Sequence, residues 1–181
     1  MTVPMALLAL LDEGPSHGFD LKRRYDALLG KERELKYGQV YSTLQRLERD
    51  GLADGVGLEA GGGADRKVYA ITAHGITEFD HWLAAPEPAS GRPAEIFTRV
   101  VLALVSGRDA DHILDAHRRA YLDRMRALTA RRHACDVIDR LAGDYEIAHL
   151  EADLRWIELA ATRLTAIAAQ VRAAGAKGSH A

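Results

Sequence analysis

Residues 38–51 read GQVYSTLQRLERDG and predict a short amphipathic helix around which the fold is organised. Val40, Leu44 and Leu47 recur at helical spacing, so one face is apolar and faces a core. A second stripe, turned away from the first, holds an amide, a hydroxyl and two guanidinium groups, from Gln39, Ser42, Arg46 and Arg49. Gly51 suits the end of the helix. These polar side chains can contact DNA bases and phosphates, although an ordinary half-buried helix also carries a polar stripe.

Two further helices are predicted before this one. Residues 3–11, VPMALLALL, are apolar nearly all round, so this helix is buried in the core or against another subunit. A second helix spans residues 17–29, with Ser16 as its N-cap and a basic cluster at residues 22–24. The cluster either contacts phosphates or forms a solvated face. Two helices joined by a loop, with the polar stripe on the second, give helix-turn-helix order.

A β-hairpin is predicted after Gly51. Residues 52–59 and 66–72 form its strands, and the glycine-rich residues 60–65 form its turn. Arg66 and Lys67 at the tip are placed to reach a phosphate or a minor groove. A nucleotide-binding loop is excluded because no Lys-Ser or Lys-Thr pair follows the glycines on a helix. Thr72 then caps a helix over residues 73–85.

The second half of the chain is predicted to be entirely helical. Three of the five prolines lie in residues 85–93, which mark a linker. Helices follow over residues 94–106, from 109 or 111 to 141, and, after a break at Gly143, over 144–173. The last carries an uninterrupted coiled-coil seam of Ile147, Leu150, Leu154, Ile157, Ala161, Leu164, Ala168 and Val171. Its partner is the preceding long helix, the same helix of a second subunit, or both. Beyond Gly175 we expect disorder.

Composition restricts the classes of protein to which the chain can belong. With 181 residues, 48% of them hydrophobic, the chain is globular and can form one or two domains. The single cysteine, Cys135, permits no internal disulfide, which fits a reducing cytoplasm. No apolar run reaches the length of about 20 residues needed to span a bilayer, and the apolar N-terminal stretch lacks the basic region of a signal peptide. The chain is therefore expected to be cytoplasmic, with no membrane contact.

Net charge does not favour nucleic-acid binding. The formal charge is −2 overall, and residues 1–85 hold 10 Lys and Arg against 13 Asp and Glu. DNA binding must therefore rest on local clustering of basic groups. Signatures of catalysis are also missing, because the eight histidines are scattered and neither HExxH, paired cysteine ligands nor a glycine-framed serine occurs. We expect no enzyme, no metal site and no cofactor.

Three stretches resemble the PadR family of winged-helix transcription regulators over roughly residues 5–85. They are ALLALLDEGPSHGFDLKRRY, GQVYSTLQRLERDGL and RKVYAITAHGITEFDHWL. Their ordered motifs are Gly14-Pro15 with His17-Gly18, Tyr41-x-x-Leu44-x-x-Leu47-Glu48 with Gly51-Leu52, and Lys67-x-Tyr69-x-Ile71-Thr72-x-x-Gly75. By its length and helix pattern, the second half resembles the larger branch of the family, which includes the phenolic-acid-responsive regulators.

The resemblance implies a mainly α fold with a small β-hairpin wing. A winged helix-turn-helix domain would occupy residues 1–85, a linker 86–93, a helical dimerisation and effector domain 94–174, and a disordered tail 175–181. It also implies a homodimer that binds a palindromic operator in double-stranded DNA as a repressor and is released by a small, possibly aromatic, molecule.

These expectations assign roles to particular residues. The predicted DNA-binding residues are Gln39, Tyr41, Ser42, Thr43, Arg46, Arg66 and Lys67. The predicted dimerisation residues are Leu7, Leu8, Ile147, Leu150, Leu154, Ile157 and Leu164. The predicted effector-binding residues are the aromatic Phe79, Trp82 and Trp156. The alternative is a winged-helix module that no longer binds DNA and recruits a protein partner through the apolar seam.

Overall fold

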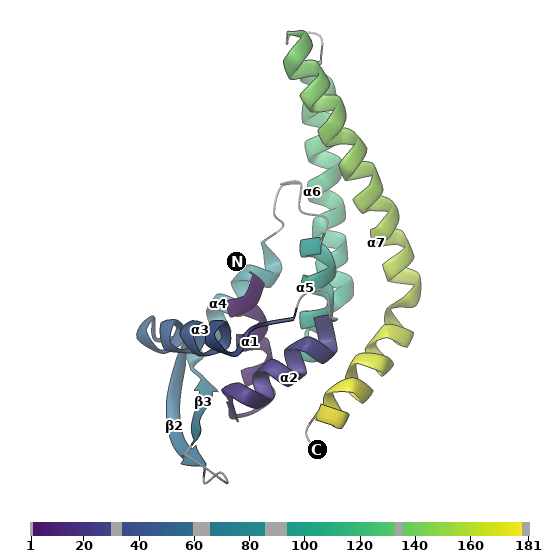
Figure 1. Cartoon of the computed structure of the whole chain (residues 1–181). Coiled ribbons are helices and arrows are strands. Elements are labelled where there is room, and N and C mark those ends of the chain that lie inside the picture. Colours follow the sequence, from purple (N-terminus) through teal and green to yellow (C-terminus); the bar gives the residue numbers. More distant parts are fainter. Residues whose placement is uncertain (1, 30–33, 60–65, 86–93, 133–135, 179–181) are drawn as a thin grey trace.

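The computed structural model describes residues 2–29, 34–59, 66–85, 94–132 and 136–178, and in these ranges it is mostly helical with one small sheet (Figure 1). The first part of the chain forms α1 (Thr2–Asp12), β1 (Ser16–His17), α2 (Gly18–Leu29), α3 (Tyr37–Arg49), β2 (Ala53–Glu59), β3 (Arg66–Ile71) and α4 (Ala73–Ala84). The second part forms α5 (Ala94–Val105), α6 (Ala110–Arg131) and α7 (Val137–Gly178). The predicted fold class, mainly α with a β-hairpin, is confirmed.

Helix α1 lies at the centre of the core. Every side chain from Met5 to Leu11 is buried, and the helix contacts α2, α3, α4, α5 and β3. Burial on all sides follows from the sequence, because a helix that is apolar all round has no face to offer to water. Leu7 and Leu8, which were predicted to serve dimerisation, are fully buried within this single chain. Of the two alternatives for α1, the structure shows burial in the core of its own chain.

The sheet has the strand order β1-β3-β2 and is antiparallel throughout. The predicted hairpin is present as β2 and β3, while its predicted turn, residues 60–65, lies outside the described residues. The short strand β1 was not predicted: Ser16 and His17 pair with Tyr69 and Val68 instead of capping and opening α2. This pairing fixes the start of α2 against the hairpin. Helices α2 and α3 followed by the hairpin make a winged helix-turn-helix (Figure 1).

Helix α3 ends as its sequence predicts. Gly51 adopts a φ of 72°, and the amides of Gly51 and Leu52 donate hydrogen bonds back to the carbonyls of Glu48 and Leu47, at 3.0 and 2.8 Å. This pair of bonds closes the last turn and directs the chain into β2. Helix α4 begins as predicted too, with the Thr72 hydroxyl accepting a hydrogen bond from the Gly75 amide at 3.0 Å.

Two predicted boundaries in the second half are wrong. Helix α6 ends at Arg131 instead of Leu141, and α7 begins at Val137 and continues through Gly143, where a break was predicted. One glycine costs a helix interior only about 1 kcal/mol, which packing along a long helix offsets. The Asp136 carboxylate accepts hydrogen bonds from the amides of Ile138 and Asp139, both at 2.8 Å, and so caps the start of α7. The helix also continues past Gly175 to Gly178, and residues 179–181 lie outside the described residues.

The two parts of the chain pack on one another. Helices α6 and α7 form a long antiparallel pair that extends away from the sheet, and the C-terminal end of α7 returns to α2 (Figure 1). Arg108, between α5 and α6, donates to Asp80 of α4 at 2.8 Å and to Asp12 at the end of α1. Its guanidinium also lies over the Phe79 ring. These contacts join the second part to α1 and α4. The predicted linker, residues 86–93, lies outside the described residues.

Asp26 of α2 holds the segment that leads into α3. Its carboxylate accepts a hydrogen bond from the Leu35 amide at 3.1 Å and from the Lys22 ammonium at 2.6 Å. Lys22 in turn donates to Glu34 at 3.0 Å. The Leu35 side chain is buried. The start of α3 is thereby fixed to α2 by polar bonds as well as by packing, although Lys36 at the N-cap provides no side-chain hydrogen bond.

Replacing Asp26 by Ala is expected to lower the free energy of unfolding by about 1–3 kcal/mol, because the Leu35 amide loses its acceptor beside the core. Asp26→Asn should cost less, since the amide oxygen can still accept that bond. Urea unfolding measures both. Asp123→Ala is the matched control: Asp123 is exposed and pairs with Arg126 on the same helix, so its loss should cost about 0.5 kcal/mol or less. Equal losses at the two positions would contradict this role of Asp26.

Candidate nucleic-acid interface

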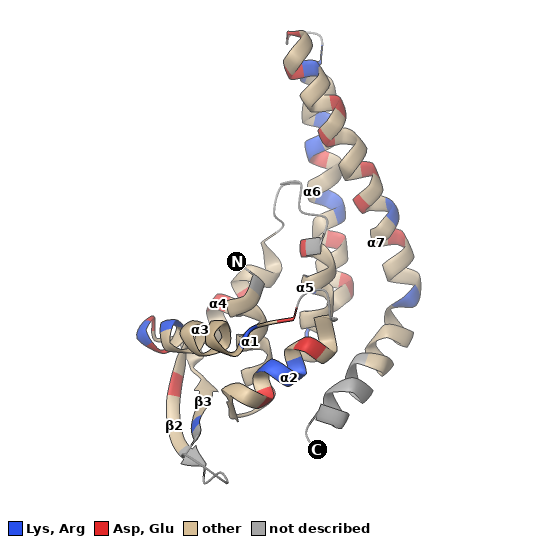
Figure 2. Ribbon diagram, viewed as in Figure 1, with Lys and Arg blue, Asp and Glu red and all other residues tan. Residues whose placement is uncertain are grey.

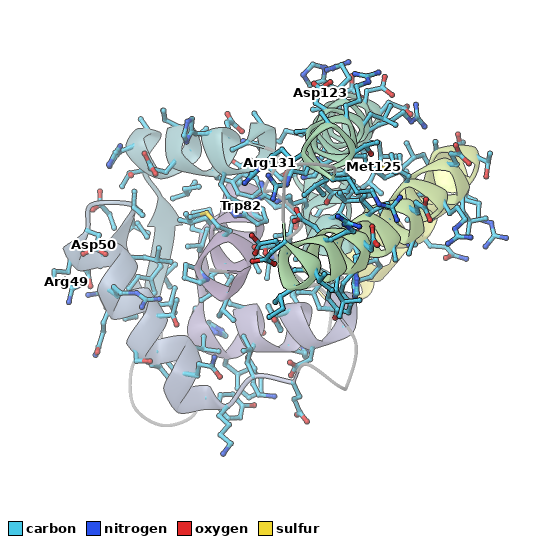
Figure 3. The ribbon with its side chains drawn as sticks, turned by 90° about the horizontal axis from the view of Figure 1, so that it is seen from above. Arg49, Asp50, Trp82, Asp123, Met125 and Arg131 are labelled. Carbon is cyan, nitrogen blue, oxygen red and sulfur yellow. The ribbon has the colours of Figure 1, made fainter. Side chains whose placement is uncertain are left out.

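Helix α3 presents two faces of opposite character. Its inner face is buried and consists of Val40, Thr43, Leu44 and Leu47. Its outer face is exposed over Gln39, Tyr41, Ser42, Gln45, Arg46 and Arg49. The apolar face holds the helix on the core, and the outer polar face is available to a partner. In Figure 3, Arg49 and the adjacent Asp50 project from the outer end of α3, whereas Trp82 lies in the interior.

Most of the residues predicted on α3 lie on the outer face. Gln39, Ser42 and Arg46 are exposed, and the Ser42 hydroxyl donates to the Gln39 carbonyl at 3.1 Å while keeping access to solvent. Tyr41 is 43% exposed, and its ring lies against Gly18, where a Cβ atom would come within 2.7 Å of Cε1. Its contact with Gly18 fixes the ring between α2 and α3.

Thr43 was predicted to bind DNA, but it does not lie on the outer face of α3. Its side chain is 6% exposed, and its hydroxyl donates to the Gln39 carbonyl at 2.7 Å. The residue follows Ser42 by one position, which rotates its side chain by about 100° around the helix, onto the inner face. Thr43 therefore supports the helix from inside and presents no group to a base edge.

The basic cluster of α2 is largely neutralised within the chain. Lys22 pairs with Asp26 and Glu34, Arg23 lies 3.5 Å from Asp20, and Arg24 pairs with Glu13. Hydrogen bonds to Asp26 and Glu34 raise the pKa of Lys22. The two predicted alternatives for this cluster were a phosphate-binding surface and a solvated face. The ion pairs argue against the first, and the burial of Lys22 does not fit the second. The charge that α2 offers to an anionic partner is correspondingly small.

The hairpin shows a similar pairing. Lys67 of β3 donates to both carboxylate oxygens of Glu48 on α3, each at 2.7 Å, and this hydrogen bonding raises the pKa of its ammonium. In the DNA-free structure the Lys67 head group is bound to Glu48, so the predicted reach toward a phosphate stays a prediction. Arg66 begins β3, but its side chain lies outside the described part of the chain.

Several exposed residues beside α3 were not singled out from the sequence. Phe19 and Tyr37 stack with ring centroids 5.7 Å apart, and both rings are partly exposed at the starts of α2 and α3. Gln45 joins the outer face of α3. Helical spacing alone identifies Gln45, whose position continues the Ser42 row at i+3, whereas the Phe19–Tyr37 contact depends on how the two helices cross.

The three aromatic residues predicted to bind an effector form two separate pairs. Phe79 and Trp82 stack at 6.2 Å, and Trp156 meets Phe97 edge-on at 6.4 Å. The Trp82 ring is covered by the Arg99 guanidinium at 4.2 Å. Phe97 and Arg99 are two residues apart on α5, hence about 200° apart around it. Trp82 and Trp156 thus lie on different sides of α5, and within the described residues the three predicted rings do not come together.

The Trp82 side chain itself retains an unsatisfied polar group. Arg99, itself buried, donates to the Trp82 carbonyl, so the main chain of Trp82 is bonded. The indole Nε1 is buried and has no hydrogen-bond partner among the residues that the structure describes. A buried donor without an acceptor costs free energy, so this N–H is a point at which an acceptor would be stabilising.

The predicted seam of α7 packs largely within the chain. Leu150, Ile157 and Leu164 are buried, while Ile147 and Leu154 are half-buried. Helix α7 contacts α2, α5 and α6, which supply the seam with partners. Apolar side chains near the start of α7 are uncovered instead: Val137, Ile138, Leu141 and Tyr145 are each at least 66% exposed.

The outer ends of α6 and α7 also carry many charges of both signs (Figure 2). Arg124 pairs with Glu146 at 2.6 Å and Arg132 with Asp144 at 3.1 Å, both across the two helices. A small cavity near this end is lined by residues from both helices, including Arg131, Arg140 and Gly143. None of the predicted effector residues lines this cavity.

Metal binding and membrane insertion find no support in the described residues. No group of three or more His, Cys, Asp or Glu side chains in those ranges is arranged to hold a metal ion. None of the described helices combines the length and apolarity required to cross a bilayer.

Comparison with known proteins agrees with this geometry. Residues 7–81 match the model of the transcriptional regulator PadR-like family. A probable transcriptional regulator of Mycobacterium tuberculosis is 35% identical over 86 residues, which are 48% of this chain and 46% of that protein. The negative transcriptional regulator PadR of Bacillus subtilis is 29% identical over 83 residues, 46% of either chain. These alignments thus span about half the length of the curated relatives that the chain matches.

One solved structure aligns with most of this chain at low identity. The crystal structure of Bacillus subtilis PadR in complex with operator DNA covers 93% of this chain and 96% of its own, at 19% identity and a TM-score of 0.46. The family and the curated relatives are transcriptional regulators and not enzymes. Over residues 7–81, the chain is therefore similar to the PadR-like family of transcriptional regulators.

Proposed function

We propose that this protein is a dimeric, sequence-specific DNA-binding regulator, and a repressor that a small molecule releases from its operator. Residues 1–85 would form the DNA-binding domain and residues 94–174 the dimerisation and effector domain. The observation that carries the proposal is the outer face of α3, which is polar and exposed while the opposite face is bound to the core.

Two copies of α3 would enter successive major grooves. Two-fold symmetry places the half-sites about one helical turn, 10–10.5 bp, or a multiple of it apart. Gln39 and Ser42 would contact base edges near the start of the helix, and Arg46 a guanine or a phosphate. Tyr41 at the α2–α3 junction would contact the backbone, and Arg66 would do so from the hairpin.

Arg46 is the most informative of these residues because its charge is uncompensated. It is exposed, and no ion pair involves it in the part of the chain that the structure describes. Arg49 nearby lies 3.0 Å from Asp50. Since Lys22, Arg24 and Lys67 are also paired with carboxylates, Arg46 would supply a large share of the local positive charge that a net-acidic chain needs to bind DNA.

Dimerisation would bury the uncovered start of α7. Val137, Ile138 and Leu141 are 71–79% exposed, although each gains about 1.5–3 kcal/mol when it is fully removed from water. A second copy is the partner that the symmetry of a palindromic operator requires. The seam residues predicted for this role would then mostly serve packing within the chain.

The effector would bind beside Trp82. The buried indole N–H lacks an acceptor among the described residues, and the ring lies between Phe79 and Arg99 at the contact of α4 with α5. A small aromatic molecule with an acceptor group would satisfy this donor. It would release DNA if it bound the DNA-free arrangement more tightly than the DNA-bound one.

Selection of DNA fragments by the purified protein at near-physiological salt should recover a palindromic motif. Arg46→Ala should weaken binding to that motif by about 1–3 kcal/mol, because a bidentate contact to a base is lost. Arg126→Ala, which removes an exposed arginine of α6, is the control and should bind like the wild type. Binding should fall steeply as salt rises. Recovery of no motif, with salt-insensitive docking to a protein, would favour the protein-interaction alternative.

Replacing Ile138 and Leu141 together by Asp should convert the protein to a monomer at micromolar concentration, since two charges would enter an apolar contact. Sedimentation velocity measures the change. Val56 on β2 is also an exposed apolar residue, so Val56→Asp serves as the matched control and should leave the dimer intact. A dimer that survives the double substitution would exclude this surface as the interface.

The two tryptophans allow the effector site to be tested separately. In Trp156→Phe, titration with a panel of small aromatic compounds should still change the remaining tryptophan emission and release operator DNA. In Trp82→Phe, DNA release by the same compound should be lost, because the indole donor is gone. An unchanged release by Trp82→Phe would place the effector elsewhere.

A further inference from the structure

An ion pair joins the hairpin directly to α3. Lys67 lies near the start of β3 and Glu48 in the last turn of α3, and the Lys67 ammonium is 2.7 Å from each carboxylate oxygen of Glu48. The covalent link between the same elements passes through the turn at Gly51. The ion pair therefore adds a second connection, farther along the hairpin than the turn itself.

The opposite strand is shaped to accept this side chain. A Cβ atom added at Gly55 of β2 would lie 2.3 Å from Cε of Lys67 and 3.1 Å from Oε1 of Glu48. The same ammonium is 5.2 Å from the centre of the Tyr69 ring. Lys67 thus extends across β2 toward α3 over a position without a side chain. At Gly57, two residues farther on, an added Cβ meets nothing within 4 Å.

We propose that Lys67 is a positioning residue, which with Glu48 sets the angle between the hairpin and α3, and that it makes no contact with DNA. Its consequence for operator recognition rests on the function proposed above. The positioning itself is a property of the DNA-free protein and can be measured without DNA.

The expected effect on recognition follows from preorganisation. Helix α3 and the hairpin must contact an operator simultaneously, with a fixed distance between the two elements. A hairpin that is free to move must be ordered on binding, and this ordering weakens the specific complex. Random DNA presents phosphates at every position, so non-specific binding depends less on the angle of the hairpin. Loss of the Lys67–Glu48 ion pair should therefore reduce the ratio of operator affinity to random-DNA affinity.

Charge compensation must be separated from positioning, because Lys67 also neutralises a carboxylate on the helix that would face DNA. Four variants separate the two roles. Lys67→Met leaves the Glu48 carboxylate without its cation. Lys67→Met combined with Glu48→Gln removes both charges and the ion pair. Gly55→Ala keeps both charges but displaces the lysine stem. Gly57→Ala is the matched control for an added methyl group on the same strand.

The first measurement is amide hydrogen exchange without DNA, over residues 53–57 and 67–71. Lys67→Met, the double variant and Gly55→Ala should each exchange about three- to fivefold faster than the wild type, because the hairpin loses a contact that limits its local opening. Gly57→Ala should exchange like the wild type. Unchanged exchange in the first three variants would overturn the proposal, whatever the protein binds.

The second measurement is affinity for the selected operator and for random DNA over a range of salt concentrations. The same three variants should lower the affinity ratio about three- to fivefold with an unchanged salt dependence. A fall in the salt slope of about one for Lys67→Met, with equal losses on both DNAs, would show a phosphate contact and overturn the proposal. If the double variant kept the wild-type ratio of operator affinity to random-DNA affinity, the Lys67–Glu48 ion pair would serve charge compensation alone. That result would also overturn the proposal. If the wild type bound no DNA, the proposed function would fail. Hydrogen exchange would still decide whether the Lys67–Glu48 ion pair positions the hairpin on α3.

Discussion

Burial of α1 on all sides is the constraint on which the arrangement of the other elements depends. A helix with seven consecutive buried residues needs neighbours around its whole circumference, and α2, α3, α4, α5 and β3 provide them. Because α5 belongs to the second part of the chain, the winged helix does not complete its core alone. Arg108 strengthens the same junction from the surface, with Asp12 on α1 and Asp80 on α4 as its two partners.

This burial explains why α3 can present a polar surface that is well fixed in place. Three inputs determine its position: the apolar face on the core, the Asp26 contacts that precede it and the turn at Gly51 that follows it. The cations around it are mostly committed to internal pairs, Lys22 with Asp26 and Lys67 with Glu48. Under the proposed function, such a chain would rely for DNA affinity on arginines like Arg46, which has no ion pair among the described residues.

The sequence predicted elements that are specified locally and missed features that depend on distant contacts. Helix α3 and its end at Gly51, the hairpin strands and the Thr72 cap follow from periodicity and turn chemistry within a few residues. Strand β1 has two residues and exists because β3, some fifty residues later, pairs with it. Helix α7 begins at Val137 and continues through Gly143, because capping by Asp136 and packing outweigh the weak preference of one glycine. In the candidate interface, helical spacing placed Gln39, Ser42 and Arg46 correctly on the outer face. The pairing of Lys67 with Glu48 could not be predicted from spacing, because it depends on the angle of the hairpin.

The position of α1 in the chain also has a consequence for synthesis. The ribosome makes this helix before its neighbours α2, α3, α4 and α5, and the last of these, α5, ends at Val105. Seven consecutive residues that are buried in the finished protein therefore remain partly uncovered until α5 has been translated. Exposed apolar segments of this kind promote aggregation and are what chaperones bind during folding. The element that holds the mature structure together is, for that interval, the segment of the nascent chain most in need of protection.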